Sequence, residues 1–192
     1  MRLAFPIVSL LAVLSLGACV MTVNDFADNP TPGDACPARV HGQWEPEGNA
    51  GPFSIDAYTD GPSCAQAAAT IVMRDPEGEV AYSDTYPARH VFTLADAKTL
   101  GEMNSALSGW ISEGSESFAS TADLPEWKEG EHAPEGGEFP FIPEEFYDQP
   151  DYERLRASAA PVYCYVQGLE SMACLAIDHG ALMKIGFQVF PG

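Results

Sequence analysis

Two strand-like runs near the C-terminus each carry a cysteine, and this arrangement limits the fold more than any other feature of the chain. Residues 162–167 and 171–177 are rich in apolar, strand-favouring residues, and the Gly-Leu-Glu stretch 168–170 separates them. A hairpin with its turn in this stretch places Cys164 directly opposite Cys174, so we expect a disulfide between them. Both faces of the hairpin are apolar, which predicts a central position with a cover on each side.

The N-terminus has the pattern of an export signal. Arg2 is positively charged, a mostly apolar stretch runs from Leu3 to Leu16, and small residues precede Cys19. The stretch is shorter than the ~20 apolar residues that cross a bilayer, and Pro6 interrupts its first part. Because Leu16 is bulky where an A-x-A cleavage site needs a small residue, ordinary signal cleavage is poorly matched.

The segment Leu16-Gly17-Ala18-Cys19 resembles the lipobox of bacterial lipoproteins. The resemblance implies that signal peptidase II removes residues 1–18, and that Cys19 carries diacylglycerol on its thiol and usually an acyl group on its amino nitrogen. Two or three acyl chains hold a protein stably on a bilayer, whereas one does so only marginally. Val20 stands where an aspartate suggests inner-membrane retention in some lipoprotein families, so the resemblance favours the outer membrane with the domain facing the periplasm. The alternative is an ordinary secretory signal that contains a cysteine by chance.

With Cys19 occupied by lipid, four of the five cysteines remain, and an even number in an exported chain favours two disulfides. Once Cys164 pairs with Cys174, Cys36 is left to pair with Cys64. A reactive thiol or a four-cysteine metal site is the competing interpretation, but the C-x-x-C spacing of a zinc ribbon is missing.

Charge and composition describe one acidic globular domain. The chain has 28 Asp and Glu against 9 Lys and Arg, a formal charge of −19, while 46% of its residues are hydrophobic. Such a protein lacks the cationic surface that binds nucleic acid. Residues 19–35, with Asn, Asp, Thr, Pro and Gly, predict a flexible tether after the lipidated cysteine, with a reach on the order of 20–25 Å. Residues 36–192 are then a single domain.

The patterns along this domain predict an α+β fold with an antiparallel sheet of about six or seven strands and two main helices. Alternation predicts a strand over residues 51–60, and two runs around Asp75-Pro76-Glu77-Gly78 predict a hairpin. Residues 65–69 fit either a short helix or the beginning of a strand. In the last strand we expect alternation, with Met183, Ile185, Phe187 and Val189 on one side and Lys184, Gly186 and Gln188 on the other.

Two helices are predicted by capping and periodicity. Residues 99–102 form a capping box, in which Thr99 and Glu102 satisfy each other's backbone amides at a helix start. This helix should end near Gly114, and a second should begin near Pro150. The expected inward-facing residues are Met103, Leu107, Trp110 and Ile111 in the first helix, and Tyr152, Leu155 and Ala159 in the second.

Residues 113–153 are the most unusual segment, an acidic loop with 13 carboxylates and one basic residue, Lys128, interleaved with aromatic residues and prolines. Long ordered loops often carry function. One interpretation is capture of a basic protein, in which Trp127, Phe139 and Phe141 are buried in the contact and the charge steers the encounter. The alternative is a loop that covers the sheet with its aromatic rings and keeps its carboxylates in water.

Motifs for metals, cofactors or catalysis are weak. The carboxylates have no calcium-loop spacing, and the four histidines have no zinc pattern, so we predict no metal and no cofactor. Gly61-Pro62-Ser63-Cys64-Ala65 lacks the last glycine of a nucleophile elbow. His179, beside Asp178, is a candidate general base in a hydrolase.

These observations favour a non-enzymatic lipoprotein of the outer membrane, attached to the bilayer through acylated Cys19, whose acidic domain binds a basic envelope protein or an incoming basic protein. A narrower alternative is an inhibitor of a basic cell-wall hydrolase of the lysozyme type. A second alternative is an envelope hydrolase that uses carboxylates or His179. A third is a structural lipoprotein without a discrete ligand.

Overall fold

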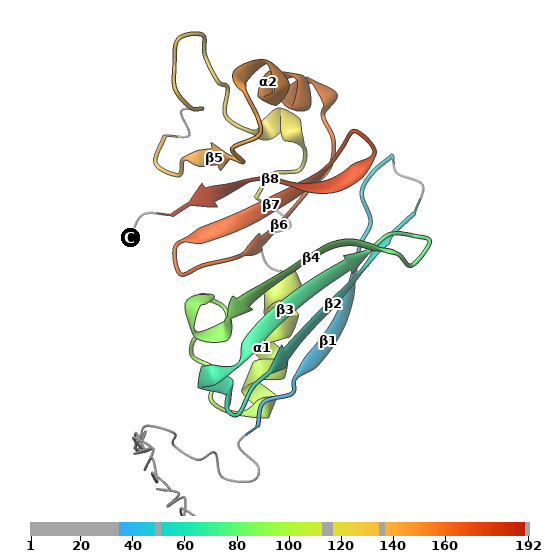
Figure 1. Cartoon of the computed structure of the whole chain (residues 1–192), viewed down its shortest axis with the longest axis vertical. Helices are drawn as coiled ribbons and strands as arrows, with labels where there is room; N and C mark the ends of the chain where they lie inside the picture. The colour runs from blue at the N-terminus through green and yellow to red at the C-terminus, as the bar shows by residue number, and fades with distance from the viewer. Residues whose placement is uncertain (1–34, 49–50, 113–116, 135–136, 191–192) are drawn as a thin grey trace, which may run out of the picture.

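Two four-stranded antiparallel sheets and two α-helices make up the fold in the computed structural model, which describes residues 35–48, 51–112, 117–134 and 137–190 (Figure 1). The first sheet has the order β1-β2-β3-β4, with β1 Arg39–Trp44, β2 Phe53–Asp60, β3 Ala68–Arg74 and β4 Val80–Pro87. The second has the order β5-β8-β7-β6, with β5 Phe141–Pro143, β6 Val162–Val166, β7 Ser171–Asp178 and β8 Ala181–Val189. Helices α1 Leu100–Ser112 and α2 Gln149–Ser158 pack against them. The predicted lipobox, Cys19 and nearly all of the predicted tether lie outside the described residues.

The α+β class is confirmed, but the prediction of one sheet with six or seven strands is wrong, because the described residues contain eight strands in two sheets. The two strands that the patterns missed are β1 and β5. Position 42 of β1 faces inward but is a glycine, so the apolar alternation of the strand is interrupted there. A Cβ at this position would lie 2.7 Å from Cδ1 of Ile111. Strand β5 has only three residues and ends in a proline, so it has no periodicity to detect.

Helix α1 covers the inner face of the first sheet and encloses the first core. Its start is the predicted capping box: the backbone N–H of Thr99 donates to Oε2 of Glu102 at 3.0 Å, and the N–H of Glu102 donates to Oγ1 of Thr99 at 3.2 Å. The predicted stripe is also confirmed, because Met103, Leu107 and Trp110 are fully buried and Ile111 is partly buried against the same core. The predicted end near Gly114 lies outside the described residues.

The β6–β7 hairpin is shared by the two cores. Cys164 pairs with Cys174 in register, as predicted, and a disulfide joins them. One face contributes Tyr163, Tyr165, Ala173 and Leu175 to the first core, and the other contributes Val162, Cys164, Met172 and Cys174 to the second. The hairpin is therefore covered on both sides, as predicted. The predicted central position holds for β7 but is wrong for β6, which is an edge strand of its sheet.

A polar network joins the two sheets where β4 meets β6. The hydroxyl of Tyr165 lies 2.8 Å from that of Tyr82 and 2.9 Å from that of Tyr86, and both of these hydroxyls donate to Oδ2 of Asp84. Burial raises the pKa of Tyr82 to about 12 and that of Tyr165 well above its usual value. The three phenols therefore stay protonated and act as hydrogen-bonding links between the sheets.

The second core lies between the second sheet and α2. Asp148 caps this helix by accepting from the N–H of Asp151 at 2.9 Å, and Tyr152 and Leu155 are buried as predicted. The inward position predicted for Ala159 is wrong. This residue is exposed and ends the helix in a left-handed conformation with φ 48°, so the helical periodicity does not extend to it.

Strand β8 contains a bulge that divides the predicted alternation. Cys174 pairs with Gly186 and Leu175 with Lys184, so Ile185 is the extra residue. The bulge places Phe187 on the same face as Lys184, whose ammonium lies 5.8 Å from the centre of the Phe187 ring. Met183 and Ile185 share a face, as expected, but the prediction that Phe187 and Val189 lie on the same face is wrong.

The second disulfide holds the N-terminal end of the domain. Cys36 is bonded to Cys64, as predicted, in a short 3-10 helix, η1, Cys64–Gln66. Residues 65–69, which fitted either a short helix or the beginning of a strand, are divided between the two, because η1 leads directly into β3. The N–H of Ala88, in the 3-10 helix η2 Ala88–His90, donates to the carbonyl of Ala67 at 2.9 Å. The end where β1 begins is thus tied to η1 and, through η1, to η2.

Candidate functional site

The aromatic residues of the acidic segment have different positions, and Phe141 belongs to the core. It is buried on β5, edge-on to Phe118 with ring centres 5.8 Å apart and tilted against Tyr152 with ring centres 6.3 Å apart. It cannot contact a partner from this position. Its predicted role as a partner contact is therefore wrong, because the inward side of β5 completes the second core.

Trp127 is half-buried and fixes the acidic segment to α2. Its backbone N–H donates to Oε1 of Glu153 at 2.8 Å, and its indole N–H donates to the carbonyl of Glu131 at 2.9 Å. Its own carbonyl accepts from Nε2 of Gln149 at 2.7 Å, and its ring packs edge-on against Tyr152. These contacts agree with the interpretation of the segment as a cover over the sheet.

Exposed apolar side chains nevertheless remain in this segment. Phe139 is exposed beside Phe190, with ring centres 5.3 Å apart. Ile142 and Phe146 are 40% and 56% exposed, and sequence reasoning did not select them. Each follows or precedes an inward-facing residue, Phe141 or Tyr147. If the sequence had shown that residues 141–143 form a strand, alternation would have placed Ile142 on the outer face.

Ile142 and Phe146 line a surface hollow of about 650 Å³ together with carboxylates. We call it the acidic hollow, and its lining consists of Ile142, Pro143, Glu144, Glu145, Phe146 and Phe187. Lys184 lies 3.1 Å from Oε1 of Glu144 and neutralises that carboxylate, whereas Glu145 is exposed. The hollow therefore combines apolar side chains with a net negative charge.

The free edge of β5 is protected against pairing with another strand. Backbone hydrogen bonds from Val189 to Pro140 and from Glu144 to Ile185 close its inner edge against β8. Pro143 has no N–H to offer to the outside. Contact at this surface is therefore expected through side chains and not by strand addition.

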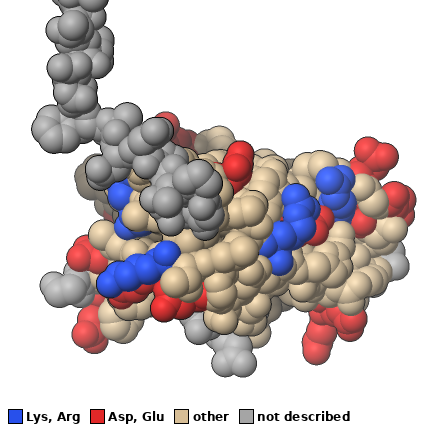
Figure 2. All heavy atoms as spheres, turned by 90° about the horizontal axis from the view of Figure 1, so that it is seen from below, with Lys and Arg blue, Asp and Glu red and all other residues tan. Residues whose placement is uncertain are grey.

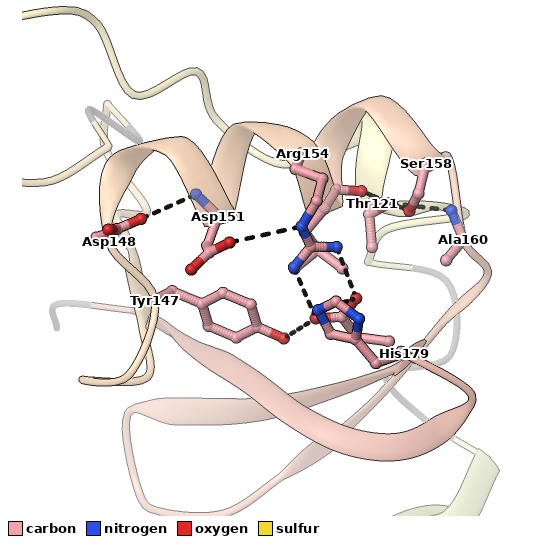
Figure 3. A network of polar contacts seen from close by, with 10 residues as sticks. Thr121, Tyr147, Asp148, Asp151, Arg154, Ser158, Ala160 and His179 are labelled. Atoms are coloured by element: carbon pink, nitrogen blue, oxygen red, sulfur yellow. Dashed lines mark hydrogen bonds and ion pairs between the residues drawn. The ribbon is translucent and has the colours of Figure 1, made fainter.

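His179 lies at the β7–β8 turn, beside a network of polar contacts that joins this turn to α2 (Figure 3). Arg154 points from α2 to the β7–β8 turn and donates to both oxygens of Asp178, at 2.9 and 3.3 Å, while the hydroxyl of Tyr147 donates to Oδ2 at 3.0 Å. His179 is 71% exposed, and its Nε2 lies 3.9 Å from Oδ1 of Asp178. Among the described residues no hydrogen bond joins His179 to a serine, threonine or cysteine side chain, so the hydrolase arrangement gains no support.

The hydrogen bond from Arg154, assisted by that from Tyr147, lowers the pKa of Asp178, although burial acts in the opposite direction. Asp178→Asn is expected to lower the Tm at pH 7 by about 2–6 °C, because the side chain loses its charge-assisted hydrogen bonds with Arg154. Since the folded pKa is depressed, this stabilisation is present above the ordinary aspartate value of about 3.9 and is lost as the pH falls through the folded pKa. The Tm difference between the two proteins should therefore shrink below about pH 4.

Asp151→Asn is the matched control, because this exposed carboxylate lies 3.5 Å from Nε of the same arginine. It should change the Tm by much less, since exposed ion pairs contribute little. An equal loss in the two variants would contradict a structural role specific to Asp178.

The described ranges contain no group of three or more His, Cys, Asp and Glu side chains that could hold a metal ion. None of the helices in these ranges has the length and apolar character needed to cross a bilayer. Comparison with known proteins gives no relative: no protein family, no curated protein and no solved structure matches this chain.

Proposed function

We propose that this chain is a lipid-anchored binding module of the bacterial cell envelope, and that its acidic hollow receives an apolar side chain of a basic protein. The lipobox and the two disulfides support a place outside the cytoplasm. The observation that carries the binding role is the exposure of Ile142 and Phe146 in a hollow lined by glutamates.

The energetics of this surface suit a protein partner. Burying an exposed phenylalanine or isoleucine side chain contributes about 1–2 kcal/mol, so two such residues in one hollow can form the centre of a small contact. Carboxylates at the rim attract a cationic partner and speed the encounter. Glu138, Glu145 and Asp148 are exposed in the same stretch of chain and extend the negative surface.

Photo-crosslinking in living cells tests the position of the contact. A photoreactive amino acid at position 146, in the full chain with its signal, should give a discrete crosslinked protein. The same amino acid at Thr85, exposed on the outer face of the first sheet, should not. Identical products from the two positions would contradict a binding role for the acidic hollow.

Lysozyme is the first purified probe, because it is a basic cell-wall hydrolase. If it binds, Phe146→Ser should weaken the affinity tenfold or more, while Thr85→Ala should leave it unchanged. Glu145→Lys should slow association at low salt, and the effect should fade at high salt. Calorimetry and surface plasmon resonance measure these changes. Absence of binding at micromolar concentration and low salt would remove lysozyme as a partner.

A further inference from the structure

A second apolar surface lies where η2 meets the β6–β7 turn. Phe92 follows η2 and is 71% exposed, and Leu169 at the tip of the turn is 57% exposed. Between them lies a hollow of about 310 Å³ with an almost wholly apolar lining. We call this surface the apolar tip. Its apolar side chains are Phe92, Val166, Leu169, Met172 and Phe190, and Glu170 and Ser171 complete the lining of the hollow.

Backbone hydrogen bonds hold the loops of the apolar tip in place. The N–H of Phe92 donates to the carbonyl of Gly168 at 3.1 Å, which joins the two loops directly. The N–H of Gly168 donates to the carbonyl of Ser171 at 3.2 Å, and the N–H of Phe190 donates to that of Glu170 at 2.8 Å. The exposed side chains are thus presented in a fixed arrangement, and a contact there requires little further ordering.

The apolar tip is also connected to the end of the domain at which the tether enters. The disulfide from Cys36 leads to η1, the hydrogen bond from Ala88 to Ala67 joins η1 to η2, and Phe92 lies two residues beyond η2. The residues before Cys36 are those that the sequence predicts as a tether of about 20–25 Å reach. A tether from Cys19 would therefore enter the domain beside the disulfide that leads to the loop of Phe92.

Charge at this end does not oppose contact with a bilayer. Arg89 and Lys98 are exposed on either side of Phe92 in the chain, and the nearby acids in the chain are Asp96 and Glu170, so the local charge is close to balanced. Figure 2 looks onto the end at which β1 begins and shows Lys and Arg side chains across it, with carboxylates beside them and at its rim. The acidic segment meets the tip where Phe139 packs against Phe190, and its surplus of carboxylates beyond that contact would be repelled by anionic lipids.

We propose that the apolar tip rests on the bilayer surface that carries the lipid anchor, and that this contact orients the domain on the membrane. The proposal rests on the lipid attachment argued under the proposed function. Phe92 and Leu169 are the side chains that enter the interface, where aromatic and aliphatic groups leave water for the boundary between headgroups and acyl chains. A short tether keeps the tip at a millimolar effective concentration near the surface, so a weak intrinsic affinity is sufficient.

Fluorescence quenching by bromine-labelled lipids tests this contact. Phe92→Trp and Phe146→Trp each replace one exposed phenylalanine, and both keep Trp44, Trp110 and Trp127 as the same background. The full lipidated chain is reconstituted into vesicles with or without brominated phospholipid. We expect at least twice as much added quenching for Phe92→Trp as for Phe146→Trp, and Leu169→Trp should behave like Phe92→Trp.

The outcomes separate this proposal from the lipid anchor. If the wild-type chain floats with vesicles, Cys19→Ser does not, and quenching is equal at positions 92 and 146, the anchor stands and the orientation is overturned. If the wild-type chain does not float, both are overturned. A tryptophan at position 92 that becomes buried with rising protein concentration, without vesicles, would assign the apolar tip to a second copy of the chain and overturn the bilayer contact.

Discussion

Gly186→Ala is expected to lower the free energy of unfolding by about 2–4 kcal/mol, which is a large part of the stability of a typical domain. A Cβ at this position would collide with the carbonyl oxygen of Ile142 and would lie 2.7 Å from ring atoms of Phe141. Neither neighbour can move freely, because Phe141 fills the second core and β5 is hydrogen-bonded to β8. The backbone φ of 155° adds strain for any residue with a side chain. Chemical denaturation with intact disulfides measures the loss.

Gly101→Ala is the matched control for this change. A Cβ there meets nothing within 4 Å, and the residue lies in the first turn of α1, where alanine is the better helix former. Its stability should rise slightly or stay the same. Equal stability of Gly186→Ala and the wild type would mean that β5 can move away from β8 without cost, and the close approach at the bulge would then be incidental.

Trp110→Ala is expected to lower the free energy of unfolding by about 3–5 kcal/mol, the range for truncating a large aromatic residue in a core. The ring is fully buried between α1 and the two sheets, edge-on to Tyr165 at 5.9 Å and to Tyr86 at 6.4 Å. Its indole N–H donates to the carbonyl of Val166 at 2.6 Å. The substitution thus removes a link between the helix and both sheets.

Trp110→Phe separates the hydrogen bond from the volume of the side chain. It keeps most of the ring but loses the donor, and we expect a loss of about 1–3 kcal/mol. Phe92→Ala removes an exposed aromatic ring and should change the stability by less than about 0.5 kcal/mol. A Trp110→Ala protein as stable as Phe92→Ala would contradict the central position of Trp110 in the first core.

The elements that could be predicted from the sequence are those whose evidence is local. The capping box at Thr99, the turn at Asp75 and the cysteine hairpin each depend on residues close together in the chain, and their geometry follows from standard turns and caps. The division into two sheets depends on the contact between β4 and β6, which are far apart in the sequence. No periodicity shows whether two such strands pair through their backbones or meet through tyrosine side chains.

The candidate surface was predicted only as a region. Acidic residues among aromatic ones select the segment, but the choice among the rings depends on which face of β5 is inward, and a three-residue strand has no measurable alternation. Phe141 is therefore in the core, while its neighbour Ile142 is outside. The apolar tip was missed for a similar reason, since Phe92 and Leu169 become neighbours only through the hydrogen bond between their loops.

The disulfide between Cys36 and Cys64 also determines how the domain bears mechanical load. Strands β1 and β2 both lie inside the covalent loop that this bond closes. Tension entering from the N-terminal side passes through the sulfur bridge to η1, so the loop cannot be extended even if its hydrogen bonds break. A pull between an anchored N-terminus and a partner held near β5 would first load β3 and the segments after it, while the edge strand β1, which would otherwise be peeled away first, is bypassed.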